Sequence, residues 1–133
     1  MPRLVNIGAG EIVDRLTILS LMILYSGLRG KPPEHFENER NALLSMMAKR
    51  EKATACLEQM LMLGAVNGAL WQAEDELRGY RAKRDLTGDK LHKNDSDATV
   101  QAAFRIQQLN DSRAELVEAI NKLAGEHLGT EKL

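Results

Sequence analysis

The segment from Gly10 to Ser26 carries apolar side chains on every side of the helix that it is expected to form. Good helix formers and the closing residues Gly27 and Gly30 predict a helix from about Gly10 to Tyr25 or Ser26. A helix that is apolar all round has to be surrounded by protein. We therefore expect this helix either at the centre of the fold or beneath a second subunit, which would make the chain a homo-oligomer.

The remainder of the chain is also rich in helix formers, and only 4% of all residues are aromatic. We predict an all-α antiparallel bundle of about four helices, three long and one shorter. The later helices are expected over about 34–63, 66–84 and 98–124, with a loop over 85–97. Gly64 and Gly68 favour a break near residues 63–65, although one continuous kinked helix is an alternative.

Apolar residues that recur at helical spacing predict which faces are buried. For the second helix they are Phe36, Leu43, Met46, Met47, Ala53, Leu57, Met60 and Leu61. For the fourth helix they are Phe104, Ile106, Leu109, Leu116, Val117, Ile120 and Leu123. A chain of 133 residues is long enough for one core, so we expect a single domain over 1–125 and a frayed tail over 126–133.

Composition disfavours several classes of partner. The net charge of −1 gives no overall attraction to nucleic acid or to anionic lipid. The apolar run Ile18–Leu24 is too short to cross a membrane, and no signal peptide is recognised, so a cytoplasmic location is expected. Cys56 is the one cysteine; it excludes an internal disulfide and is expected to be buried and unreactive.

A polar stripe follows one face of the predicted third helix. Asn67, Trp71, Glu74 and Arg78 are separated by 4, 3 and 4 residues, which brings them within about 60° of one another at about 100° per residue. The apolar residues of the same helix lie to one side of this stripe. The stripe therefore borders the core, where it can either lock helices together or hold a polar ligand.

A second polar group interrupts the apolar face of the predicted fourth helix. Arg113 lies in the middle of that face, and Asn110 lies beside it. A buried guanidinium is costly without a carboxylate partner, so an acid from another helix is expected to pair with Arg113. A structural hypothesis is an inter-helix network that fixes register, made of Asp14, Glu74, Arg78, Asn110 and Arg113.

The leading functional hypothesis is a non-enzymatic module that binds a small anionic ligand, such as a nucleotide or signalling nucleotide, without a cofactor. Arg78 and Arg113 would contact the anionic group, and Trp71 would stack on a ring. Asn67 and Asn110 would orient the ligand. The supporting residues of this site would be Glu11, Asp14, Thr17 and Glu74.

Two alternatives remain open. Carboxylates on neighbouring helices can hold Mg²⁺, so Glu11, Asp14 and Glu74 could belong to a magnesium-dependent nucleotide or phosphate hydrolase. The denser Glu-Glu-x-x-Glu cluster typical of helical pyrophosphohydrolases is missing from the sequence. The other alternative is a structural oligomer or partner-binding bundle, with the first helix as its interface.

Three motifs together carry a family resemblance: GEIVDRLTIL at 10–19, VNGALWQAEDELR at 66–78, and LNDSRAEL at 109–116 followed by Ile120 and Asn121. They resemble a family of small all-helical bacterial and phage proteins of uncharacterised function. The second and third motifs are also similar to another uncharacterised family, associated with surface-polysaccharide gene clusters. The resemblance implies shared polar positions at Glu11, Asp14, Thr17, Asn67, Trp71, Glu74, Asp75, Arg78, Asn110 and Arg113.

Overall fold

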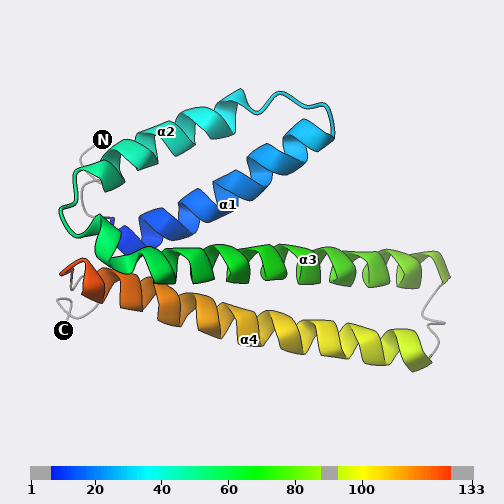
Figure 1. Ribbon diagram of the computed structural model, residues 1–133. Helices are drawn as coiled ribbons and strands as arrows, with labels where there is room; N and C mark the ends of the chain where they lie inside the picture. Colours follow the sequence, from blue (N-terminus) through cyan, green and yellow to red (C-terminus); the bar gives the residue numbers. More distant parts are fainter. Residues whose placement is uncertain (1–6, 88–92, 127–133) are drawn as a thin grey trace.

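The computed structural model describes residues 7–87 and 93–126, and within these ranges the chain is helical without strands (Figure 1). Its elements are α1 (Ala9–Leu28), α2 (Glu34–Ala48), the short 3-10 helix η2 (Ala53–Cys56), α3 (Leu57–Thr87) and α4 (Lys93–Leu123). The predicted all-α bundle of four helices is confirmed. The predicted loop is shorter than expected, because α3 continues to Thr87 and α4 begins at Lys93.

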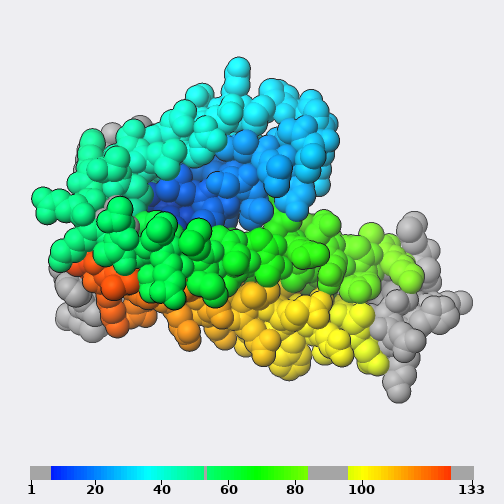
Figure 2. All heavy atoms as spheres, viewed as in Figure 1, coloured from blue at the N-terminus to red at the C-terminus, as the bar shows by residue number. Residues whose placement is uncertain are grey.

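The helices form two hairpins that are joined at one end of the bundle. Helices α3 and α4, of 31 residues each, run antiparallel, and the α1–α2 hairpin lies against one side of that pair (Figure 1). Helix α1 contacts all three other helices, which agrees with the central position, the first of the two positions expected for it. The α3–α4 pair extends beyond the α1–α2 hairpin at the far end (Figure 2).

The predicted break near residues 63–65 is wrong. Helix α3 runs through Gly64 and Gly68, and the chain leaves the helical path between Ala48 and Ala53 instead. A glycine inside a helix costs only about 1 kcal/mol, which the burial of Leu63 against its neighbours outweighs. The true break lies in a charged segment that lacks glycine and proline, so no local signal marks it.

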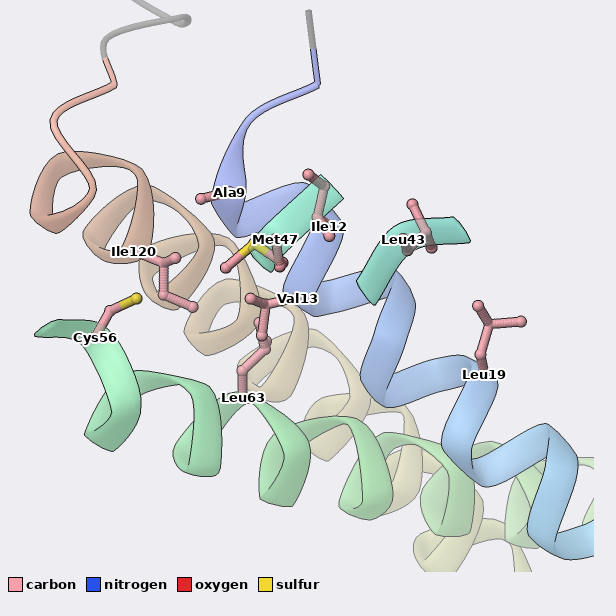
Figure 3. Packing of buried hydrophobic residues seen from close by; sticks show 9 residues of the cluster. All are labelled: Ala9, Ile12, Val13, Leu19, Leu43, Met47, Cys56, Leu63 and Ile120. Atoms are coloured by element: carbon pink, nitrogen blue, oxygen red, sulfur yellow. The ribbon is translucent and has the colours of Figure 1, made fainter. Parts of the chain in front are cut away.

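The core lies where the two hairpins join (Figure 3). Its buried side chains come from all four helices and η2: Ala9, Ile12, Val13, Leu19, Leu43, Met47, Cys56, Leu63 and Ile120. Cys56 is fully buried, as predicted, and burial raises the pKa of its thiol. No helix within the described residues has both the length and the apolar character needed to cross a membrane.

Four residues predicted to be buried are exposed. Leu57, Leu61, Phe104 and Leu123 have exposed fractions of 59%, 68%, 64% and 40%. Phe104 follows the fully buried Ala102 by two residues, which is about 200° around the helix and therefore on the opposite side. Phe104 is predicted to be buried because it is apolar. The face of α4 that contacts the core is narrower than the band of apolar residues in its sequence.

A close contact between α1 and α4 depends on a glycine. A Cβ placed on Gly10 would overlap the main-chain carbonyl oxygen of Val117 and would lie 2.9 Å from the Val117 Cγ1 atom. Because that carbonyl is main chain of α4, it cannot move away without shifting the helix. Gly10 therefore sets how closely the two helices approach each other.

We expect Gly10→Ala to lower the free energy of unfolding by about 1–3 kcal/mol, because the added methyl group forces α1 and α4 apart. Gly68→Ala is the matched control, since a Cβ there meets nothing within 4 Å and alanine favours the helix by up to about 1 kcal/mol. Urea denaturation followed by circular dichroism measures both. Equal midpoints for the two variants would contradict the proposed close packing.

Candidate functional site

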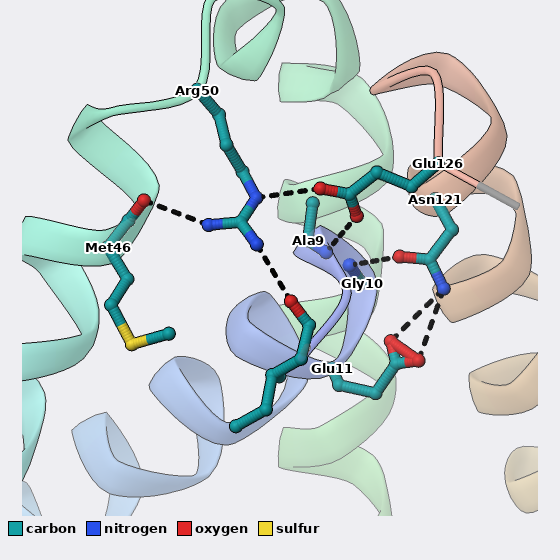
Figure 4. Close-up of polar contacts among 8 residues, drawn as sticks. Ala9, Gly10, Glu11, Met46, Arg50, Asn121 and Glu126 are labelled. Atoms are coloured by element: carbon teal, nitrogen blue, oxygen red, sulfur yellow. Dashed lines mark hydrogen bonds and ion pairs between the residues drawn. The ribbon is translucent and has the colours of Figure 1, made fainter. Parts of the chain in front are cut away.

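The first turn of α1 is capped by the end of α4 (Figure 4). Gly8 precedes α1 and offers no side-chain cap. Instead, the Ala9 amide donates to Glu126 Oε2 at 2.5 Å, and the Gly10 amide donates to Asn121 Oδ1 at 2.7 Å. Two amides that a helix N-terminus leaves without partners are thus satisfied by a distant part of the chain.

The turn that ends α4 places Glu126 for this role. Gly125 has a φ of +78°, and the amides of Gly125 and Glu126 donate to the carbonyls of Lys122 and Asn121 at 3.0 and 2.7 Å. This is the Schellman pattern, which glycine favours. Placing Glu126 in a frayed tail was therefore wrong for this residue; residues 127–133 lie outside the described part of the chain.

Arg50 extends the same junction to α2. Its Nε atom lies 2.8 Å from Glu126 Oε1, its Nη2 donates to the Ile7 carbonyl at 2.7 Å, and its Nη1 donates to the Met46 carbonyl at 2.9 Å (Figure 4). One guanidinium therefore joins the end of α2, the entry to α1 and the end of α4. The sequence analysis missed Arg50, since its partner follows far along the chain and the intervening break was misplaced.

A second polar cluster, which we call the Asp14 clamp, consists of Asp14, Thr17, Asn67 and Arg113. Arg113 binds Asp14 in a two-bond fork, with Nε to Oδ1 at 2.8 Å and Nη2 to Oδ2 at 2.6 Å. Asn67 Nδ2 lies 2.8 Å from Asp14 Oδ1 and 2.6 Å from the Thr17 hydroxyl oxygen. The clamp joins α1, α3 and α4 through one carboxylate.

The clamp is only partly shielded from solvent. Asn67 is 3% exposed, while the side chains of Asp14 and Arg113 are 16% and 34% exposed. Hydrogen bonding to Asp14 raises the pKa of the Arg113 guanidinium against an opposing effect of burial, and the charges of Asp14 and Glu74 raise it further. Arg113 therefore has the carboxylate partner that the sequence analysis required.

Other members of the predicted set lie outside the clamp. Arg78 is exposed and lies 3.4 Å from Asp75 in a loose ion pair on its own helix. Asn110 is exposed. Glu11 is exposed and accepts hydrogen bonds from Asn121 at 3.0 and 3.2 Å, so it holds an amide and not an arginine. Glu74 influences Arg113 through its charge.

The carboxylates suggested for magnesium are not gathered together. Asp14 is occupied by Arg113 and Asn67, Glu11 contacts Asn121, and Glu74 is exposed. Across the described ranges no three His, Cys, Asp or Glu side chains are placed to hold a metal ion. This geometry does not favour the hydrolase alternative.

Trp71 lies in a separate place, at a groove between α1, α2 and α3. Its ring is parallel to that of Tyr25, with centroids 5.2 Å apart and planes 3° apart. The groove has a volume of about 260 Å³ and is lined by Met22, Tyr25, Ser26, Arg29, Lys31, Phe36 and Trp71. Of the predicted ligand residues, only Trp71 reaches it.

The groove carries two cations that the sequence analysis did not select. Arg29 and Lys31 flank Gly30, whose φ of +70° closes α1 in a second Schellman turn; the Lys31 amide donates to the Ser26 carbonyl at 2.8 Å. No carboxylate lines the groove, and among the described residues none forms an ion pair with Arg29 or Lys31. The sequence pattern predicts Gly30 only as the residue that ends the helix.

Comparisons of the chain with models of protein families, with curated proteins and with solved structures found no match.

We expect Arg113→Ala to lower the free energy of unfolding by about 1–3 kcal/mol, because it leaves the largely buried Asp14 carboxylate with an unpaired charge. Arg105→Ala is the matched control on the same helix. Arg105 pairs with Glu76 at 2.9 Å, but both side chains are more than 40% exposed, so a change below about 1 kcal/mol is expected. Thermal and urea unfolding measure both variants, and equal losses would contradict a specific role for the clamp.

Proposed function

We propose that this protein is a non-enzymatic helical module that binds a small anionic ligand, such as a nucleotide, in the groove between α1, α2 and α3. The observation that carries the proposal is the combination in one groove of a stacked aromatic pair with two cations and no lining carboxylate. Apolar walls with a few convergent polar groups are typical of ligand sites. A ring can pack on the aromatic surface while an anionic group meets the cations.

Trp71 keeps the stacking role that the sequence-based hypothesis gave it, but different cations meet the anion. Arg113 is committed to Asp14, and Arg78 lies on an exposed face of α3, so Arg29 and Lys31 are the residues assigned to the anion. The Asp14 clamp then has a supporting role, because it holds α1 against α3 and so positions the groove walls. Asn67 belongs to that support.

Two further parts of the proposal rest on the sequence. The three motifs support membership of the family of small all-helical bacterial and phage proteins that they resemble. The single cysteine favours a reducing compartment such as the cytoplasm.

The test uses Trp71 as a reporter, since it is the only tryptophan in the chain. Titration with nucleotides and sugar phosphates, with and without magnesium, is expected to change its fluorescence. Arg29→Ala with Lys31→Ala should weaken binding at least tenfold, because a hydrogen bond to a charged group contributes about 1.5–3 kcal/mol. Lys49→Ala with Arg81→Ala removes the same charge from exposed positions that do not line the groove and should leave binding unchanged.

Thermal unfolding gives an independent readout of the same proposal. A ligand that binds only the folded chain adds about 2.7 kcal/mol of stability at 100 times its dissociation constant, which shifts the midpoint by several degrees. Absence of any fluorescence or stability change across the panel would refute the proposal. Turnover that requires magnesium would support the hydrolase alternative in its place.

A second candidate role is self-association through α1. Leu24 and Leu28 are 56% and 73% exposed on the half of α1 that lies away from the core, and a second copy of the chain could cover them. Light scattering over a range of concentrations should then show a dimer or larger species. Leu28→Glu should give a monomer, whereas Leu61→Glu, at a 68% exposed site on α3, should not. A monomer at every concentration would refute this role.

A further inference from the structure

The size of the groove limits what it can hold. Its volume of about 260 Å³ falls just below the range of about 300–1,000 Å³ that is usual for drug-sized ligands. It has room for one ring system and a short substituent. A cyclic dinucleotide, with two bases, could seat only part of its surface there.

The aromatic surface sets the shape of the ring. Tyr25 and Trp71 are stacked, with centroids 5.2 Å apart and planes 3° apart, so each ring covers one face of the other, and Phe36 supplies an apolar side chain from α2. Both rings of the pair are half-buried and retain surface that faces the groove. A planar base can extend this stack on a ring face that the pair leaves uncovered, and stacking does not depend on the identity of the base.

The cations set the charge and its position. Arg29 is the C-cap residue of α1, and Lys31 follows two residues later. The turn at Gly30 fixes the backbone between them. Two positive side chains that line the same groove suit a compact dianion, and a phosphate monoester carries about −1.5 to −2 charges at neutral pH. With no carboxylate in the lining, the groove lacks the acidic ligand that usually helps to hold the Mg²⁺ that accompanies a triphosphate.

The lining also limits selectivity among bases. Apart from the two cations, its polar side-chain groups are the hydroxyls of Ser26 and Tyr25 and the Trp71 indole N–H. No side-chain amide or carboxylate lines the groove, and Arg29, whose guanidinium could pair with a guanine edge, is assigned to the phosphate. The affinity of the groove for different bases should therefore follow their stacking area, so that purines bind more tightly than pyrimidines.

We infer that the ligand is a mononucleotide or an aromatic phosphate monoester of similar size, with its ring against Tyr25 and Trp71 and its phosphate between Arg29 and Lys31. This inference rests on the function proposed for the groove. It narrows the ligand from any small anion to one planar ring and one terminal phosphate. It also predicts that adenine and guanine nucleotides bind about equally.

The test compares AMP, GMP, CMP, adenosine, inorganic phosphate, ATP and cyclic di-GMP by Trp71 fluorescence, with calorimetry as a second readout. AMP and GMP should bind within about threefold of each other and at least threefold more tightly than CMP. Adenosine and inorganic phosphate should each bind at least tenfold more weakly than AMP. ATP and cyclic di-GMP should gain nothing over AMP.

Variants separate the two halves of the ligand. Lys31→Gln should weaken AMP at least threefold while leaving adenosine unchanged, because only the phosphate meets the cation. Trp71→Leu, followed by calorimetry, should weaken AMP and adenosine alike. The melting temperature of each free variant, if equal to that of the parent chain, confirms that the fold is intact.

The outcomes distinguish this inference from the proposed function. If ATP or cyclic di-GMP binds tenfold more tightly than AMP in a manner lost with Arg29 and Lys31, the inference is overturned and the groove remains an anion site. If adenosine binds as tightly as AMP, the assignment of the phosphate is overturned. If no compound binds at millimolar concentration, the proposed function itself fails.

Discussion

The arrangement of the bundle depends on the hydrogen bonds and the ion pair that the carboxylate of Asp14 forms. This carboxylate accepts two hydrogen bonds from Arg113 of α4 and one from Asn67 of α3, and so fixes α1 against both helices of the other hairpin. Apolar packing alone would allow these helices to slide by a turn, whereas a two-bond arginine–carboxylate fork has one geometry. The groove lies farther along α1, so its shape depends on the register that Asp14 sets.

The N-terminus of α1 is fixed by main-chain capping. Glu126 and Asn121 accept hydrogen bonds from its first amides. Arg50 forms an ion pair with Glu126 and also donates to the carbonyls of Ile7 and Met46. Caps of this kind contribute about 1 kcal/mol each. Helix α1 is therefore anchored along its first half, and its second half is held by apolar packing and by the Tyr25–Trp71 contact. Segments with fewer anchors are where binding functions are usually found.

Local pattern predicted the helical class, the extent of α1 and the need of Arg113 for an acid, since periodicity and desolvation act within one helix or one side chain. It did not predict the junction, because Arg50 and Glu126 are 76 residues apart and meet only in the folded chain. It also misplaced the break between the second and third helices. The free energy that a glycine costs inside a helix is smaller than the free energy that tertiary burial supplies there. Chain-wide contacts override local preference at these positions.

The polar stripe of α3 illustrates the limit of such prediction. Its residues do share one face, yet they differ in surroundings because α1 reaches only the first two of them. Asn67 is buried beneath α1, Trp71 meets Tyr25 near the end of α1, and Arg78 is exposed. Sequence spacing gives the direction of a side chain but not the point at which a neighbouring helix stops. The turn at Gly30 decides that point, and it also places Arg29 and Lys31 beside Trp71. The end of α1 therefore both limits the structural part of the stripe and supplies the charges of the proposed ligand site.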